Sequence, residues 1–145
     1  MKAVVQRVKE TSLRVDNKLI SEIPFGLIIY LGIKRGDTTS QADYLAQKIA
    51  KLRVFEDENF KMNKSVLDVN GEIMCVSQFT LYGDVSKGNR PSFIEAEAPD
   101  KAKELYDYFC EKLSSQSVVV KKGVFGADMK ISQLSDGPVT IIYEI

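Results

Sequence analysis

The chain has 145 residues, of which 44% are hydrophobic and 28% are charged, and its 20 basic and 20 acidic residues leave no net charge. This length and balance are typical of one folded domain with its own core, and they argue against a disordered chain or one that coats long nucleic-acid duplexes. The chain has no histidine, which excludes Ser-His-Asp and Cys-His catalytic centres and nearly all zinc sites built on imidazole.

The amino-terminal segment MKAVVQRVKE is too short and too interrupted in its apolar character to be a signal peptide. No window of the sequence approaches a membrane span, so we expect a cytoplasmic protein that does not enter a membrane. Cys75 and Cys110 stand far apart without a CxxC spacing, and each lies in a segment with the character of a core strand or helix. We therefore expect both thiols to be reduced, buried and inert.

The amino-terminal third predicts a hairpin followed by a central strand. Residues 3–23 are rich in β-branched side chains and contain an Asp16-Asn17 turn signal, which indicates two strands joined as a hairpin. Gly26 to Ile33, GLIIYLGI, is a continuous apolar run of strand length. Such a run is typical of a strand buried on both faces, so we expect it at the centre of a sheet.

An amphipathic helix is predicted after the turn at Gly36-Asp37. Apolar residues recur at helical spacing, and Thr38 and Gln41 stand in capping-box register. Three cations follow at the predicted end of the helix: Lys48, Lys51 and Arg53. A solvated face at a favourable helix terminus accounts for them, and contact with RNA is the alternative.

Residues 54–93 predict a second hairpin and a long loop. An Asn70-Gly71 pair is of the kind that closes a two-residue hairpin, which predicts flanking strands, the second over about residues 72–80. Residues 82–93, YGDVSKGNRPSF, are rich in glycine and polar residues and indicate a surface loop. Lys87 and Arg90 in this loop could receive a phosphate, although the loop lacks P-loop spacing.

The remaining residues predict a second helix and the last strands. Pro99 suits the first turn of a helix whose apolar stripe includes Leu105 and Phe109. Residues 117–145 alternate well enough for two or three strands. Two helices among seven or eight strands, mostly joined by hairpin-type turns, predict a single α/β domain of the α+β type over residues 1–145, with a curved, mainly antiparallel sheet.

Polar residues at the end of the strand MCVSQFTL are the first candidates for chemistry. Ser77, Gln78 and Thr80 meet the following loop, where side chains and free backbone amides can converge on a ligand. A hydroxyl nucleophile needs a base, and no histidine is present to supply one, so structural hydroxyls are favoured. The acidic run at residues 56–58 indicates solvated side chains, and we assign it no role.

For two further features, the residues alone allow two interpretations each. The stretch SDGPVT, residues 135–140, indicates a strand-connecting turn, or else a stiff functional piece of backbone, because X-Pro bonds adopt the cis form at modest cost. Arg7 lies in a valine-rich strand, where it points either to water or inward. An inward Arg7 needs partners, and carbonyl oxygens are the obvious ones.

Taken in order and spacing, seven stretches resemble the D-aminoacyl-tRNA deacylase family across essentially the whole chain: MKAVVQRV, LRVFED, KMNKSVLDV, VSQFTLYGD, KGNRPSF, GVFGADM and DGPVT. SQFTL and GPVT, about sixty residues apart, form a specific pair. The resemblance implies a three-layer β/β/α domain that works as a homodimer. It also implies hydrolysis of the ester joining a D-amino acid to the 3′ adenosine of tRNA, acceptance of glycine, and no metal or organic cofactor.

By the same resemblance, Ser77, Gln78, Phe79 and Thr80 line the catalytic site, with backbone amides near Phe79 holding the ester carbonyl. The remaining family positions fall on Gly137 and Pro138, a cis pair that enters the partner's pocket and selects the substrate by chirality, on Arg7, which braces that pair, and on Met129 beside it. Ser135 departs from the family pattern, which has asparagine there, and its weaker hydrogen bonding in a turn puts the bracing of the pair in question.

Two alternatives compete with this hypothesis. A non-catalytic module that binds the tRNA acceptor end, suggested by Lys87 and Arg90, predicts binding without turnover. A covalent mechanism with Thr80 as nucleophile predicts that removal of its hydroxyl abolishes hydrolysis. An aminoacyl ester is already activated and its ribose carries a vicinal 2′-hydroxyl, so positioning and polarisation by the protein would suffice without either.

Overall fold

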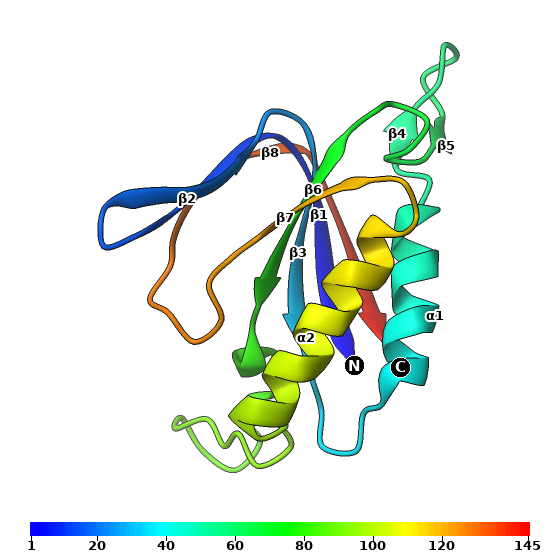
Figure 1. The fold of residues 1–145 in the computed structure, drawn as a ribbon. Coiled ribbons are helices and arrows are strands. Elements are labelled where there is room, and N and C mark those ends of the chain that lie inside the picture. The colour runs from blue at the N-terminus through cyan, green and yellow to red at the C-terminus, as the bar shows by residue number, and fades with distance from the viewer.

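The computed structural model describes residues 1–145. Figure 1 shows a strongly bent sheet with both α-helices on one side. The elements in chain order are β1 (Lys2–Val15), β2 (Lys18–Ile23), β3 (Gly26–Gly32), α1 (Thr39–Ala50), β4 (Phe55–Glu56), β5 (Met62–Lys64), β6 (Glu72–Ser77), the 3₁₀ helix η1 (Phe79–Tyr82), α2 (Pro99–Ser114), β7 (Val119–Lys122) and β8 (Lys130–Glu144).

The main sheet has the order β2-β1-β3-β6-β7, with β8 paired to β1. β1 is antiparallel to β2, β3 and β8, whereas β3, β6 and β7 run parallel to one another. Parallel neighbours need a crossover connection, and α1 and α2 lie in the two crossovers. The sheet is therefore mixed, with three antiparallel and two parallel pairings, and the expected α/β class with two helices is confirmed.

Two hydrophobic cores separate three layers. The larger core lies between the sheet and the two helices, and includes Leu27, Ile29 and Ile73 from the strands. The smaller core comprises Val8, Leu13, Ile23, Ile28, Met74 and Val76. It fills the other face of the sheet, beneath the arm that β2 and the second half of β1 form as they bend away from the helices (Figure 1). The β/β/α layering implied by the family resemblance is present.

Local signals correctly predicted the first helix and the first hairpin. The Thr38 hydroxyl caps α1, and the Gln41 side chain completes the capping box. Asp16 and Asn17 both have positive φ, at 49° and 63°, as a two-residue hairpin turn requires. α2 begins at Pro99 as expected. No helix is long and apolar enough to cross a membrane.

The hairpin predicted at Asn70-Gly71 is wrong. The Asp68 carboxylate accepts from the Ser65 amide and hydroxyl, both at 2.7 Å, and the Gly71 amide donates to the Val66 carbonyl at 2.9 Å. Residues 65–70 therefore form a helical turn that Asn70 ends with a φ of 52°. β5 pairs with β4 instead, and β6 joins β3 in parallel, ending at Ser77 and not near residue 80.

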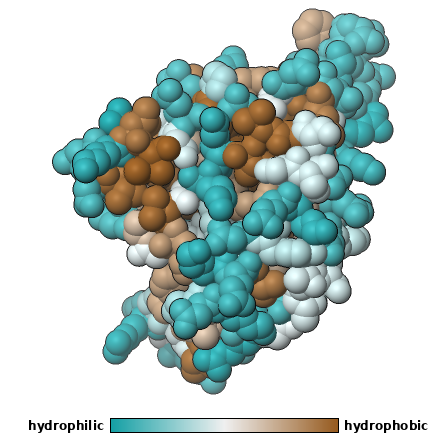
Figure 2. Space-filling view, in the orientation of Figure 1, coloured by the Kyte–Doolittle hydropathy of each residue, from teal (hydrophilic) through white to brown (hydrophobic).

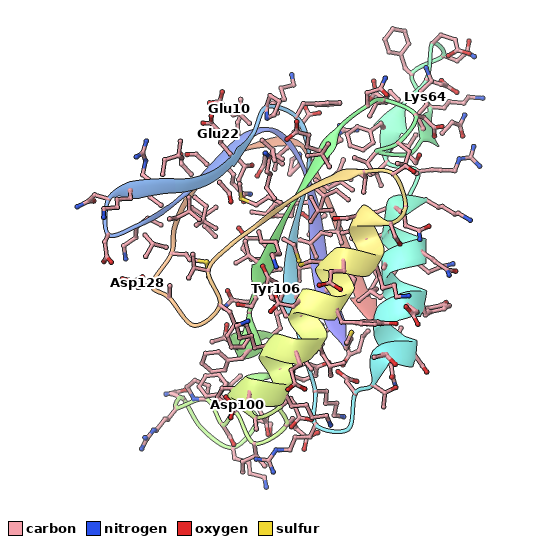
Figure 3. All side chains as sticks on the ribbon, viewed as in Figure 1. Glu10, Glu22, Lys64, Asp100, Tyr106 and Asp128 are labelled. Carbon is pink, nitrogen blue, oxygen red and sulfur yellow. The ribbon has the colours of Figure 1, made fainter.

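Both cysteines are buried and free, as expected. Cys75 lies in the centre of β6, where burial raises the pKa of its thiol well above the usual value. The Tyr106 hydroxyl, on α2, donates to the Cys75 carbonyl at 2.8 Å. This hydrogen bond ties α2 to the sheet just before β6 reaches the candidate site, and Figure 3 labels Tyr106 beside α2.

Candidate functional site

A pocket of about 690 Å³ opens where β3 and β6 end. Because the two strands are parallel, their carboxyl ends meet at one edge of the sheet, which is where α/β sheets commonly bind ligands. The walls come from these strand ends, from residues 93–102 and from residues 125–131. Figure 3 marks two of these walls, with Asp100 at the start of α2 and Asp128 in the loop before β8. The lining is mostly apolar, with Arg35, Glu97 and Asp128 as its charged members.

Ser77, Gln78 and Phe79 lie together in this pocket at the β6-η1 junction. The Gln78 amide makes the last sheet hydrogen bond, to the Leu31 carbonyl at 2.8 Å, and the Gln78 side chain donates to the Thr80 hydroxyl. In η1, Leu81 is the first residue whose backbone amide donates a hydrogen bond, and its acceptor is the Gln78 carbonyl at 3.3 Å. The amides of Phe79 and Thr80 are therefore free to bind a ligand oxygen.

Phe79 and Met129 form apolar parts of the pocket. The Phe79 ring packs edge-on against Phe93, with 5.0 Å between ring centroids, yet its side chain stays 58% exposed. Met129 packs against Gly123, where an added Cβ would stand 2.8 Å from the Met129 sulfur. The pocket is thus lined by large apolar groups, of which Phe79 keeps much of its surface uncovered.

Gly137 and Pro138 lie in a wide bulge of β8. Gln6 pairs with Thr140 and Val8 pairs with Ser135, so the four residues 136–139 stand opposite Arg7 alone. The Gly137–Pro138 peptide bond is cis, and Gly137 has a φ of +118°. Both residues are exposed, and neither lines the pocket of its own chain.

Arg7 is buried beneath this bulge, with 8% of the residue exposed. Its Nη1 donates to the Val54 carbonyl at 2.6 Å, and its Nε donates to the Asp136 carbonyl at 3.3 Å. The same Nε lies 3.0 Å from the Asp136 carboxylate. Arg7 therefore points inward and binds carbonyl oxygens, and it supports the residue next to Gly137.

A network of side-chain amides and hydroxyls holds the two ends of the bulge. Gln133 Nε2 donates to Ser135 Oγ at 2.9 Å and to Gln6 Oε1 at 3.0 Å, and Gln6 Nε2 donates to Thr140 Oγ1 at 3.1 Å. Tyr30 completes the network by donating to Gln133 Oε1 at 2.9 Å, and burial raises the pKa of its hydroxyl, which keeps this donor protonated. Ser135 thus has a partner where the family pattern has asparagine.

Within one chain the predicted residues form two groups and a separate loop. Ser77, Gln78, Phe79 and Met129 line the pocket with Thr80 adjacent; Arg7, Gly137 and Pro138 form the bulge; Lys87 and Arg90 lie on the exposed loop between the bridged residues Asp84 and Ser92. Met129 lines the pocket, whereas Gly137 lies in the bulge and does not line it. Sequence reasoning missed Phe93, Phe125 and residues 96–99 as pocket walls, although KGNRPSF and GVFGADM contain the two aromatic rings.

Known proteins match this chain over nearly its full length. A family model described as D-Tyr-tRNA(Tyr) deacylase matches residues 4–144. The chain belongs to this family. Curated D-aminoacyl-tRNA deacylases of Bacillus cytotoxicus and Bacillus thuringiensis are 53% identical to it over 144 residues, covering 99% of each sequence. The shared activity is that of a hydrolase, which favours the enzyme over the non-catalytic binding module.

Solved structures agree on the fold. A structure described as c-Myc DNA Unwinding Element Binding Protein is 45% identical, with a TM-score of 0.94, and the match covers 100% of this chain and 99% of that one. A structure described as a probable eukaryotic D-amino acid tRNA deacylase has a TM-score of 0.85 at 20% identity, covering 99% and 98% of the two chains. The second likeness speaks for the fold alone.

Proposed function

We propose that this deacylase works as a homodimer in which Gly137 and Pro138 of one subunit close the pocket of the other and select D-aminoacyl-tRNA by chirality. One observation carries the proposal: the bulge presents Gly137 and Pro138 outward, away from the pocket of their own chain. A rigid, exposed piece of backbone held by Arg7 from below is suited to entering a second molecule.

The surface around the bulge supports a second copy of the chain as its partner. β8 pairs with β1 alone, so its other edge offers unpaired backbone groups. Leu134 and Ile142 flank the bulge with 53% and 66% of their surface exposed. Figure 2 shows further apolar residues gathered over the β1–β2 arm. Exposed apolar surface of this kind beside an open strand edge is typical of an interface.

The free amides of Phe79 and Thr80 suit the ester carbonyl, where they would stabilise the charge that develops as water attacks. The carbonyls of the inserted Gly-Pro pair would accept hydrogen bonds from the α-ammonium group and leave no space for a side chain on the L face. Glycine has no side chain to exclude, so glycyl-tRNA would also be hydrolysed. The vicinal 2′-hydroxyl of the ribose would move protons, because the pocket offers no histidine base.

The paired assay on D-tyrosyl-tRNA and L-tyrosyl-tRNA tests this proposal. We expect rapid hydrolysis of the D-ester, slower hydrolysis of glycyl-tRNA, and an L-ester that decays only at the uncatalysed rate. Equal hydrolysis of both enantiomers would refute the chiral filter, and a monomer in sedimentation at working concentration would refute its supply by a partner.

The exposed loop that carries Lys87 and Arg90 would contact the RNA. The reaction would take place in the cytoplasm, where tRNA is charged.

Thr80→Ala is expected to retain most of the activity. The Thr80 hydroxyl accepts from Gln78 and has no base beside it, so it is a poor nucleophile. We expect kcat to fall by less than about tenfold, since loss of a covalent nucleophile costs far more. Single-turnover hydrolysis of D-tyrosyl-tRNA measures this, with Thr80→Ser as the control that keeps the hydroxyl. Complete loss in Thr80→Ala with rescue by Thr80→Ser would establish the covalent mechanism instead.

A further inference from the structure

We propose that a basic groove at the end of α1 binds phosphates of the tRNA acceptor end. The groove has a volume of about 370 Å³ and is lined by Gln47, Lys48, Lys51, Leu52, Arg53 and Tyr143. Figure 1 shows the end of α1 rising beside β8 toward the β4–β5 hairpin. The lining contains three cations and no carboxylate, so its own chemistry selects an anionic ligand.

None of the three cations of the groove has a carboxylate within ion-pair distance. Lys48, Lys51 and Arg53 form no ion pair, whereas the neighbouring lysines Lys64 and Lys112 pair with Glu58 and Asp43. Asp68 is an acidic neighbour of Arg53 but forms no ion pair with it, and its carboxylate accepts hydrogen bonds from the Ser65 amide and hydroxyl. In a chain without net charge, three unpaired cations in one groove are a local excess that phosphates would neutralise.

The helix terminus explains only part of this cluster. Lys48 lies in the last turn of α1 and Lys51 caps it, so both are favoured by the partial negative charge at that end. Arg53 lies beyond the helix. Its Nε donates to the Asn63 carbonyl at 2.6 Å and its Nη2 to the Asn63 side-chain oxygen at 2.9 Å. This leaves Nη1 of an already oriented guanidinium free, which is the geometry that suits a phosphate.

Aromatic rings border the groove, as they do in many RNA-binding surfaces. Tyr143 forms part of its wall, and the Lys48 ammonium lies 5.9 Å from the centre of the Tyr44 ring. Tyr44 is itself half exposed. A backbone-binding surface of cations with interleaved aromatic side chains suits a single-stranded end, where bases are free to stack.

The groove lies next to the bulge that carries Gly137 and Pro138. One guanidinium joins them, because Arg7 binds both the Val54 carbonyl, adjacent to Arg53, and the Asp136 carbonyl, adjacent to Gly137. If the bulge closes the partner's pocket, as proposed above, the groove would lie near that pocket and would receive phosphates of the strand that carries the esterified 3′ end. Only this assignment to the partner's pocket rests on the proposed function; phosphate binding by the groove does not.

The test is a salt titration of uncharged tRNA binding to the triple variant Lys48→Gln, Lys51→Gln, Arg53→Gln. We expect affinity at about 0.1 M salt to fall by roughly tenfold to a hundredfold, and the slope of log K against log salt to decrease by about 2 to 3. The matched control is the triple variant Arg14→Gln, Lys18→Gln, Lys121→Gln. It removes the same number of positive charges from β1, β2 and β7, and these three cations also form no ion pair. The control should bind as the wild type does.

Steady-state kinetics supply the second readout. The groove variant should raise KM for D-tyrosyl-tRNA with kcat nearly unchanged, and should hydrolyse 3′-D-tyrosyl-adenosine, which lacks the phosphates, as the wild type does. An unchanged salt slope, or an equal loss in the control variant, would overturn the proposal. The salt titration measures tRNA binding without turnover. Its result therefore does not depend on whether the D/L assay supports the chiral filter.

Discussion

Gly137→Ala is expected to lower kcat/KM for D-tyrosyl-tRNA by on the order of a hundredfold or more, because a misplacement of about 1 Å in a positioning group has that effect. A Cβ at this position would stand 2.8 Å from Val139 Cγ2 and 3.0 Å from the Val139 amide nitrogen, and 3.3 Å from Arg7 Nη2. The neighbours at 2.8 and 3.0 Å belong to the bulge itself, so the bulge must shift at the residue proposed to face the substrate. Steady-state hydrolysis of D-tyrosyl-tRNA measures the loss.

Gly36→Ala is the matched control. Gly36 also has a positive φ, of +88°, but nothing lies within 4 Å of an added Cβ. Both variants therefore place alanine in an unfavourable backbone conformation, at a cost of about 1 to 3 kcal/mol, and they differ in the steric contact. Gly36→Ala should hydrolyse D-tyrosyl-tRNA at nearly the wild-type rate. If Gly137→Ala does so too while its oligomeric state is unchanged, Gly137 has no part in placing the substrate.

The elements that local sequence predicted well are those with local causes. The capping box of Thr38 and Gln41, the turn at Asp16-Asn17 and the proline at the start of α2 each act within one turn of chain. Asn70-Gly71 misled because asparagine adopts the left-handed conformation equally well in a hairpin turn and at the end of a helical turn. The Ser65–Asp68 hydrogen bonds, which lie outside the pair, decide between the two.

The candidate site was predictable as two motifs but not as an arrangement. SQFTL marks the end of β6, yet the pocket also needs residues 93–102 from the β6–β7 crossover and residues 125–131 from the β7–β8 loop and the start of β8. The sequence left open whether the Arg7 side chain points to water or to the core. Nothing in β1 shows that four residues of β8 stand opposite Arg7 alone. Both facts depend on pairings between segments far apart in sequence, which periodicity does not report.

Arg7 links the fold to the proposed selectivity, because one side chain supports the bulge and the basic groove together. Its guanidinium binds the carbonyls of Val54 and Asp136, and Val54 is 4% exposed. Arg7→Met keeps the length and apolar stem of the side chain but leaves the Val54 carbonyl without this donor. An unsatisfied buried polar group costs about 1 to 3 kcal/mol, and more when a charged donor is lost.

We therefore expect Arg7→Met to lower the free energy of unfolding by about 2 to 4 kcal/mol in urea titrations. Asp136→Asn separates the contributions: it removes the carboxylate that lies 3.0 Å from Arg7 Nε but keeps both carbonyl acceptors of the guanidinium. Because the buried Arg7 charge keeps those two acceptors, we expect a smaller loss of stability than in Arg7→Met. Protein concentration is held equal, because the unfolding of a dimer depends on concentration.

If Asp136→Asn destabilises the protein as much as Arg7→Met does, the ion pair and not the carbonyl contacts holds the bulge. A bulge held by carbonyl contacts stays in place when the carboxylate is neutralised, so Asp136→Asn should also retain D-selective hydrolysis where Arg7→Met loses it.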